Sequence, residues 1–346
     1  MFTRGVNNVR TLSLTFYKLC MVIVAITLIF QDCSPFEGGG SSGLSYPTYK
    51  GFSQPVGIAI DTLGNLWVTD NIKPGIVVQA WGYGVVPQYA HRVGAYPMGL
   101  AIDASGNVWV ANSADNSVSE IFYAPGINPN IATYPVGNYP HGIAIDASGH
   151  VWVANTGDLN ISELSPTGTT IGTYLINGPP SHIAIDASEN IWVSTSNNII
   201  KLSSQGMTIC TYSAGGYAIA IDASGNVWVT MSNGVTELNP QCIAIGKYPA
   251  GNAGIAIDAS GNIWVADSFG DTVTELSPAG VIKNTYYRVG DFLRGIAIDN
   301  EGNVWVANSA DGILTKIPFV AKGPQYFPCS HFTDTSCPQF QGGGNF

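Results

Sequence analysis

The chain has 346 residues, with 23 acidic side chains against 13 Lys and Arg, so its formal net charge at pH 7 is -10. This charge makes nucleic acid a poor partner, because phosphate binding needs clustered Lys and Arg. An apolar content of 45%, with no run long enough for several membrane spans, also excludes a disordered chain and a polytopic membrane protein.

The first forty residues differ in composition from the rest of the chain. Basic residues precede an apolar run from Leu19 to Phe30, which is shorter than the ~20 residues of a membrane span and is typical of a secretory signal. We predict a signal peptide at 1–32 and a flexible Gly/Ser-rich tether at 33–43. We therefore expect an exported protein of the bacterial cell envelope, in the periplasm or outside the cell.

Cys33 follows the apolar run almost directly. This arrangement resembles the leader of bacterial lipoproteins, in which the first mature residue is a cysteine that carries a lipid. Asp32 stands where that pattern has Gly or Ala. Two alternatives stay open: a lipid on Cys33 anchors the protein, or the leader is removed by plain cleavage nearby.

The body of the chain repeats the segment Gly-Ile-Ala-Ile-Asp-Ala-Ser-Gly-Asn-Val-Trp-Val-Ala-Asn with small variations. Each copy has a Trp six residues after its Asp, and successive copies are 36 to 43 residues apart, which is typical of propeller blades of four short strands. The repeated aspartates are Asp61, Asp103, Asp146, Asp186, Asp222, Asp258 and Asp299.

Each copy predicts strands. Ile-Ala-Ile and Val-Trp-Val flank a turn sequence and form a hairpin, a third strand alternates polar and apolar residues, and a fourth ends in Tyr-x-x-Gly. The last copy lacks a fourth strand, and residues 44–51 look like one, so we predict that this N-terminal strand closes the ring. The predicted fold is all-β, a seven-bladed β-propeller of four-stranded antiparallel blades at 44–318, followed by a Pro/Gly-rich tail at 319–346.

The repeat resembles that of NHL-type propellers and of the streptogramin (virginiamycin B) lyases, which are seven-bladed. The resemblance covers about residues 44–318 and implies the fold, whereas the same scaffold hosts lyases, lactonases and binding proteins. The lyases use a histidine and glutamates with Mg²⁺. Here the glutamates lie in the tether, in third strands or in turns of the opposite face, so the resemblance carries no lyase residues over to this chain.

The repeated Asp and Trp residues have structural interpretations. Asp followed by x-x-Gly caps its own turn, and a Trp between two blades is a packing residue. In the fourth copy Glu189 replaces the turn glycine, at a position that we expect to be left-handed. Trp81 lies outside the repeat register and is a candidate for stacking on a ligand.

Polar residues recur where the second strands end, three positions after each Trp. One interpretation is that they cap the turn into the third strand. The other is an oxygen-rich site at the mouth of the channel, which binds a polar ligand such as a sugar, with Asp70 and Asp267 holding Ca²⁺ or Mg²⁺. In the closed ring these residues form an unbroken arc: Asp267, Asn308, Asp70, Asn112 and Asn155.

His141 and His182 lie where the first strands of blades three and four begin, on the same face as the arc. They are candidates for a catalytic base if a partner tunes their pKa, and are otherwise ordinary polar residues of a rim. The cysteines lack zinc-site spacing. Cys329 and Cys337 lie close together in the tail, where an exported protein can form a disulfide.

The sequence favours an exported monomer that binds a protein partner or a polar or carbohydrate ligand on the face of the arc, without catalysis. It contacts a membrane only through a lipid on Cys33. The alternative is a metal-dependent lyase or lactonase, in which Asp70 and Asp267 hold the metal and His141 or His182 is the base.

Overall fold

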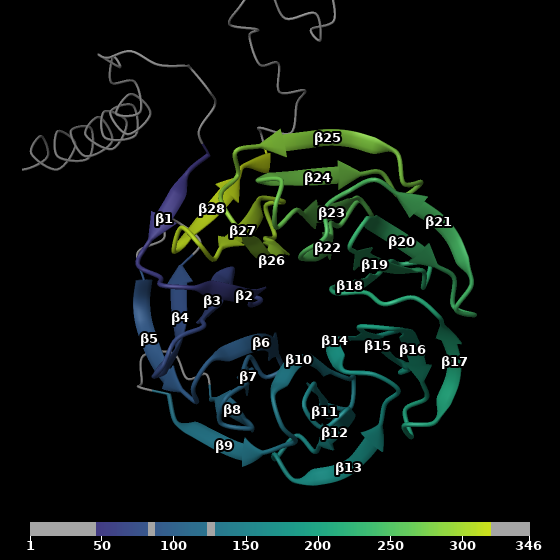
Figure 1. Ribbon diagram of the computed structural model, residues 1–346. Coiled ribbons are helices and arrows are strands. Elements are labelled where there is room, and N and C mark those ends of the chain that lie inside the picture. The colour runs from purple at the N-terminus through teal and green to yellow at the C-terminus, as the bar shows by residue number, and fades with distance from the viewer. Residues whose placement is uncertain (1–45, 82–86, 123–128, 320–346) are drawn as a thin grey trace, which may run out of the picture. The chain divides into compact units, whose positions relative to one another are not determined.

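The computed structural model describes residues 46–81, 87–122 and 129–319, which belong to one compact unit. The described residues form strands and no α-helix, and none of their elements is a helix able to cross a membrane. The predicted signal peptide, Cys33, the tether and the Cys329–Cys337 pair lie outside these ranges. Seven sheets of four antiparallel strands confirm the predicted seven-bladed propeller (Figure 1).

The strands follow one another blade by blade along the chain. Blade one is β2 (Pro55–Ile60), β3 (Asn65–Asp70), β4 (Gly75–Trp81) and β5 (Pro87–Val93). Blade two is β6 (Pro97–Ile102), β7 (Val108–Asn112), β8 (Ser117–Ile121) and β9 (Ile131–Pro135). Blade three is β10 (Pro140–Ile145), β11 (Val151–Asn155), β12 (Asn160–Leu164) and β13 (Thr170–Leu175).

The same order continues round the ring. Blade four is β14 (Pro180–Ile185), β15 (Ile191–Thr195), β16 (Ile199–Leu202) and β17 (Thr208–Tyr212). Blade five is β18 (Ile219–Ile221), β19 (Val227–Met231), β20 (Gly234–Leu238) and β21 (Ala244–Tyr248). Blade six is β22 (Ile255–Ile257), β23 (Ile263–Ala266), β24 (Thr272–Leu276) and β25 (Ile282–Tyr287). Blade seven is β26 (Leu293–Ile298), β27 (Val304–Asn308), β28 (Ile313–Ile317) and, from the other end of the chain, β1 (Thr48–Lys50).

The N-terminal strand closes the ring, as predicted. β1 pairs with β28 in an antiparallel ladder that places Tyr49 opposite Leu314. The ring of Tyr49 lies 5.3 Å from that of Trp305, so it takes the place of the fourth-strand tyrosine that the last repeat lacks. The closure leaves blade seven with four strands like the others.

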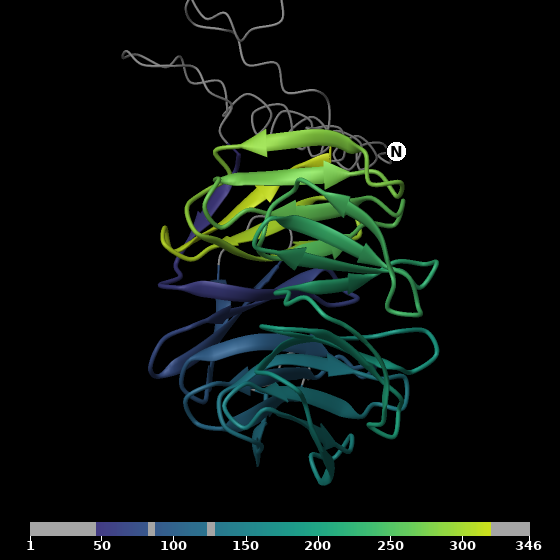
Figure 2. The ribbon, with the colours of Figure 1, turned by 45° about the vertical axis from the view of Figure 1, so that its right-hand side comes forward.

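The hydrophobic core is divided among the seven interfaces between neighbouring blades, which pack side by side round the ring (Figure 2). At one of them Trp152 of blade three packs with Ile183, Ile191 and Val193 of blade four. All seven repeated Trp side chains are at most 1% exposed. Burying a large apolar side chain contributes about 2 kcal/mol, so each interface stabilises the ring substantially.

The repeated aspartates cap the turn between the first and second strands. In blade one, Oδ1 of Asp61 accepts hydrogen bonds from the backbone N–H groups of Leu63 and Asn65, and Oδ2 accepts one from the indole N–H of Trp67. The bond between Asp and Trp recurs in all seven blades at 2.9 to 3.2 Å. The capping interpretation is confirmed, and the indole bond ties each turn to the buried Trp.

The third-strand glutamates are structural too. In blade two, Tyr134 stacks on Trp109 with ring centroids 5.5 Å apart and donates its O–H to Oε2 of Glu120 at 2.8 Å. Burial and the neighbouring Glu120 raise the pKa of Tyr134 to about 12. Blades three, five and six repeat this arrangement of Trp, Tyr and Glu.

Candidate ligand-binding face

One side of the ring carries the turns between second and third strands together with the connections between blades; we call it the connection face. The first strands begin on this side and lie nearest the axis of the ring (Figure 1). Most of their residues are partly exposed although they are central, so solvent reaches them along the axis. We call the start of these strands the channel mouth.

Both aspartates of the predicted arc accept hydrogen bonds from backbone groups. The two Oδ atoms of Asp70 accept from the N–H of Ser53 at 3.0 and 3.1 Å, and Oδ1 also accepts from the N–H of Gln54 at 2.6 Å. Oδ1 of Asp267 accepts from the N–H of Phe269 and of Gly270. The bonds of Asp267 are those of the predicted cap of the turn into the third strand, whereas Asp70 caps the connection that leads into β2.

The three asparagines of the arc are completely buried. Nδ2 of Asn112 donates to the hydroxyls of Ser117 and Ser119 in β8, so this side chain extends along the sheet towards the third strand. A Cβ on Gly94 of the preceding connection would lie 2.7 Å from the side chain of Asn112, so the packing here is close. Asn155 and Asn308 are packed in the same way, and a role of the arc in ligand binding stays a prediction.

The structure brings the two candidate histidines together at the channel mouth. The rings of His141 in β10 and His182 in β14 meet edge to face with their centroids 5.0 Å apart. Nδ1 of His141 lies 3.1 Å from the carbonyl oxygen of Ser181, whereas Nδ1 of His182 is buried with no partner among the described residues. Because a carbonyl only accepts, the proton of neutral His141 is on Nδ1, and Nε2 is an acceptor.

The surroundings keep both histidines neutral. Burial lowers the pKa of His141, and the charge of Arg294 lowers it further, against the bond to Ser181. Burial lowers the pKa of His182 to about 3, with smaller contributions from repulsion by protonated His141 and by Arg294, although the carbonyl of Tyr217 acts in the opposite direction. At neutral pH the pair therefore offers ring nitrogens as donors and acceptors and carries no positive charge.

Two further residues of the channel mouth escaped the sequence analysis. Arg294 in β26 is exposed, and Tyr217, just before β18, is 53% exposed. Their positions in the repeat indicate this location, because both stand five residues before a repeated Asp, as His141 does in blade three. Alignment of the seven copies on that Asp places one ring of variable residues at the mouth: Val56, Met98, His141, Ser181, Tyr217, Ala253 and Arg294.

A pocket of about 530 Å³ opens on the connection face between blades four and five. It lies at the two blades whose second strands interrupt the polar arc. Its walls combine aromatic and apolar side chains with polar groups and with the backbone of several glycines. The side chains that characterise it are Tyr212, Tyr217, Met231, Asn233, Lys247 and Tyr248.

Blade four lacks the arrangement of Trp, Tyr and Glu that other blades share. Lys201 stands where they have the third-strand Glu, and its Nζ lies 4.9 Å from the centre of the Trp192 ring and 3.1 Å from Oδ2 of Asp186. Tyr212, the repeat tyrosine of this blade, therefore has no third-strand Glu to bond, and it lines the pocket. The blade in which Lys201 replaces the repeated Glu is thus one of the two blades that form the pocket.

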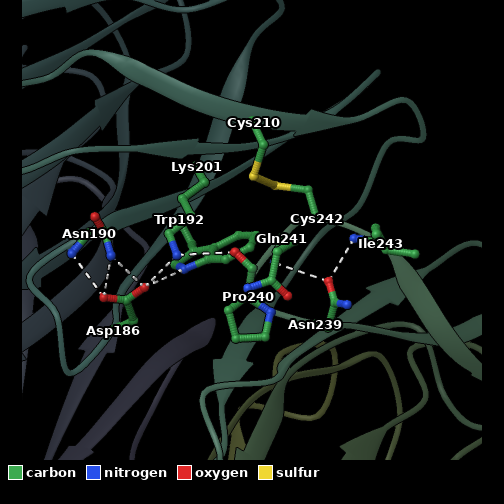
Figure 3. The surroundings of a disulfide bond; sticks show 10 residues. All are labelled: Asp186, Asn190, Trp192, Lys201, Cys210, Asn239, Pro240, Gln241, Cys242 and Ile243. Atoms are coloured by element: carbon green, nitrogen blue, oxygen red, sulfur yellow. Dashed lines mark hydrogen bonds and ion pairs between the residues drawn. A yellow bond between two sulfur atoms is a disulfide. The ribbon is translucent and has the colours of Figure 1, made fainter.

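Two cross-links join the blades that form the pocket. A disulfide connects Cys210 of β17 to Cys242, which lies in the turn before β21 (Figure 3). Lys201 of blade four also donates to the carbonyl oxygen of Pro240 in blade five at 3.2 Å (Figure 3). The cysteine spacing did not predict this disulfide, because the two cysteines are 32 residues apart and only the ring brings their strands together.

The described ranges contain no group of three or more His, Cys, Asp or Glu side chains that could hold a metal ion. The carboxylate oxygens of Asp70 are already bonded to backbone N–H groups. These residues do not assemble the donor set that a lyase-like Mg²⁺ site needs. Binding of Ca²⁺ or Mg²⁺ by Asp70 and Asp267 stays a prediction. Trp81 is the last residue of β4, and its predicted role in stacking on a ligand stays a prediction.

Comparisons with known proteins agree with the architecture. A family model for the NHL repeat matches residues 138–162, which include the Asp146 turn and the strands on either side of it. No curated protein sequence matches the chain.

Solved structures resemble the fold at low sequence identity. Virginiamycin B lyase from Staphylococcus aureus is 20% identical with a TM-score of 0.67, over 79% of this chain and 98% of that one. A streptogramin B lyase is 18% identical with a TM-score of 0.68, over 79% and 96%. Hydrazine synthase from Kuenenia stuttgartiensis is 14% identical with a TM-score of 0.66, over 82% and 100%. The chain is therefore a seven-bladed β-propeller with an NHL repeat, and its fold is related to that of the streptogramin B lyases.

Proposed function

We propose that this protein is an exported, monomeric propeller that binds a polar ligand, such as a carbohydrate, or a polar segment of a protein partner, without catalysis. The observation that carries the proposal is the pocket between blades four and five. It opens on the same face as the channel mouth and is held by two cross-links between its blades. A pocket of this size suits part of a small ligand.

The chemistry of the pocket fits a ligand that has both polar and apolar surfaces. The ring of Tyr217, which is 53% exposed, provides a face on which C–H groups of a sugar ring can pack, and Tyr212 and Tyr248 also line the pocket. Asn233 and Lys247 add hydrogen-bond donors, and Asn233 adds an acceptor. Such a mixture of stacking faces and a few polar groups is typical of sites that bind and orient a ligand.

The histidine pair favours binding over general-base catalysis. A base works best when its pKa is near the working pH, whereas burial and neighbouring positive charge lower the pKa of His182 to about 3. The first strands and second strands that surround the two histidines carry no Asp or Glu that could restore their basicity. Their nitrogens are therefore better suited to hydrogen bonding with a ligand.

Saturation-transfer NMR with a panel of neutral oligosaccharides tests the proposal. We expect at least one of them to bind, and Tyr217→Ala to weaken that binding about tenfold, the effect of losing roughly 1.4 kcal/mol of stacking. Tyr89→Ala is the matched control, because Tyr89 is similarly exposed at 52% but lies on the outermost strand of blade one. Unchanged binding by Tyr217→Ala would exclude the pocket as the site.

The alternative is a metal-dependent lyase or lactonase, favoured by the fold shared with streptogramin B lyases and by the histidine pair on the connection face. It requires that millimolar Ca²⁺ or Mg²⁺ raise the melting temperature, and that Asp70→Asn with Asp267→Asn abolish this effect. It also requires ring opening of a lactone or cyclic ester, followed by mass spectrometry, to depend on His141 or His182. A melting temperature that neither ion changes would exclude this alternative.

Export is part of the proposal and has its own support. The disulfide between Cys210 and Cys242 suits an oxidising compartment, where such bonds form and persist. We expect the mature chain to lack residues 1–32, and a lipid on Cys33 would add a corresponding mass. Intact-mass spectrometry of the protein from membrane and soluble fractions distinguishes lipid anchoring from plain cleavage.

A further inference from the structure

We infer that Arg294 and His141 form a site for an oxyanion at the channel mouth, where they bind a carboxylate, sulfate or phosphate group of the ligand. The inference deepens the proposed function of the connection face, on which it rests, and assigns a chemical class to the part of the ligand that lies over the axis. Three observations support it: the isolation of Arg294, its support by an aromatic ring, and the state of the histidines.

Arg294 is the only charged residue in the seven first strands. These strands are otherwise built from small and apolar residues, with His141 and His182 as their only other ionisable groups. Among the residues that the structure describes, no carboxylate forms an ion pair with Arg294. What distinguishes Arg294 is its place, because an exposed cation among the apolar first strands near the axis favours an anionic ligand.

The guanidinium of Arg294 is supported at the channel mouth. Its Cζ lies 4.4 Å from the centre of the Phe292 ring, and Phe292 in turn contacts Phe269 edge to face, with centroids 6.1 Å apart. Stacking on a ring leaves the edge of the guanidinium open. That edge presents parallel N–H donors that match the two oxygens of a carboxylate or of a sulfate.

The histidines face Arg294 from the other side of the axis. β26 lies across the ring from β10 and β14 (Figure 1), and the charge of Arg294 acts on both histidines. The strands packed around His141 are β6, β7, β11 and β14, and His182 is the only ionisable side chain that they contribute. None of these strands therefore places a carboxylate beside His141, and Arg294 is the charged group that acts on it.

This arrangement couples anion binding to proton uptake. Nε2 of neutral His141 is an acceptor and repels an oxyanion, whereas protonated His141 donates to it. Without an anion, the charge of Arg294 disfavours that proton, and an oxyanion between the two groups offsets this repulsion. Binding of the anion should therefore raise the affinity of His141 for a proton, and acid should strengthen anion binding.

Calorimetric titration with sulfate at constant ionic strength tests the site. Sulfate is the probe because its charge is constant over the pH range used. We expect saturable binding to the wild type and a loss of at least about tenfold in affinity for Arg294→Gln, as for a charge-assisted bidentate bond. Arg92→Gln is the matched control: it removes the same charge from an exposed residue of the outermost strand of blade one, and should bind sulfate like the wild type.

Measurement of sulfate binding at two pH values tests whether His141 takes up a proton when the anion binds. We expect sulfate to bind more tightly at about pH 5.5 than at about pH 7.5, by up to about tenfold per pH unit if one proton is taken up. His141→Asn should remove this dependence. Arg294→Lys, which keeps the charge but loses the planar pair of donors, should bind with intermediate affinity and guards against a folding defect of Arg294→Gln.

Three results would overturn the inference: no saturable sulfate binding, equal binding by Arg294→Gln and the wild type, or equal affinity at both pH values. None of them affects the binding of neutral oligosaccharides in the pocket lined by Tyr217. Sulfate binding and oligosaccharide binding therefore distinguish a failure of the anion site from a failure of the proposed function. Loss of oligosaccharide binding with sulfate binding intact would instead leave the anion site standing without the pocket.

Discussion

Glu189 is the residue at which backbone strain and a hydrogen bond oppose each other. Its φ is 61°, in the left-handed region that we expected, where the other six blades have glycine with φ between 79° and 87°. Its Oε2 nevertheless accepts a hydrogen bond from the backbone N–H of Ala147 in blade three at 3.2 Å. The strain of a side chain there is ~1 to 2 kcal/mol, and a partly exposed hydrogen bond contributes less.

The two effects can be separated with two variants. We expect Glu189→Gly to be slightly more stable than the wild type, because it loses the strain as well as the bond. Glu189→Ala keeps the strain and loses the bond, so it should be the least stable, about 1 kcal/mol below Glu189→Gly. Denaturant unfolding gives this order, and a more stable Ala than Gly variant would show that the turn is not strained.

His182 should make the propeller sensitive to acid. Its pKa is about 3 in the folded protein and about 6.5 in the unfolded chain. The unfolded chain therefore takes up a proton below about pH 6.5 while the folded ring does not, and stability is lost as pH falls from there towards 3.

Alanine is a suitable replacement for His182, because Ala218 stands at the equivalent position of the next blade. We expect the wild type to lose roughly 2 kcal/mol more than His182→Ala between about pH 7 and pH 5. Denaturant unfolding at both pH values measures this difference. An equal loss in both proteins would mean that His182 is protonated in the folded state.

At the scale of elements, β1 determines whether the ring is closed. It is only three residues long, but Tyr49 packs on Trp305, and Tyr46 just before it is 8% exposed against Tyr286. Without β1, the ladder edge of β28 has no partner strand. Unpaired backbone groups and lost packing both act against the folded state.

Deletion of residues 44–51 should lower the free energy of unfolding by several kcal/mol, given the cost of an unpaired edge. Tyr49→Ala tests the packing alone and should cost a part of that amount, whereas Tyr89→Ala on the exposed side of blade one should have little effect. Chemical denaturation measures all three. An unchanged midpoint for the deletion would show that β1 does not close the ring in solution.

The disulfide acts on the molecule as a whole, because it joins two neighbouring blades of the ring. Cys210 and Cys242 are 32 positions apart in the sequence, and linking them restricts the unfolded chain. In the chain-entropy model this contributes roughly 3 to 4 kcal/mol. Its loss should also loosen the pocket, whose walls belong to the same two blades.

We expect Cys210→Ala with Cys242→Ala, and equally the reduced wild type, to melt well below the oxidised protein. The double variant is its own control, because a reductant should no longer change its melting temperature. Non-reducing peptide mapping should identify the linked pair directly. Two free thiols at these positions in the exported protein would contradict the disulfide.

The fold could be predicted from the sequence because its information is local and repeated. Each Asp caps a turn within four residues and bonds a Trp six residues on, so one short segment determines one hairpin. Counting the copies gave the number of blades, and the missing fourth strand after Ile317 pointed to β1. The left-handed turn at Glu189 was predictable for the same reason, from six glycines in equivalent positions.

The candidate site could be predicted only in part, because its geometry spans the ring. The asparagines of the arc stand at the expected face, yet their direction depends on close packing against glycines of the preceding connection, as at Gly94. His141 and His182 meet because adjacent blades place their first strands side by side, and Arg294 faces them because blade seven lies opposite blades three and four in a ring of seven.

The amino-acid sequence by itself thus determined the blade, the number of blades and the way in which the ring closes, since these follow from contacts within a few residues and from repetition. Only the tertiary structure decided which variable residues share the channel mouth, where the pocket opens and that Cys210 pairs with Cys242. Those contacts join residues tens to hundreds of positions apart. Their distances depend on the curvature of the whole ring and on side-chain packing, which no local pattern records.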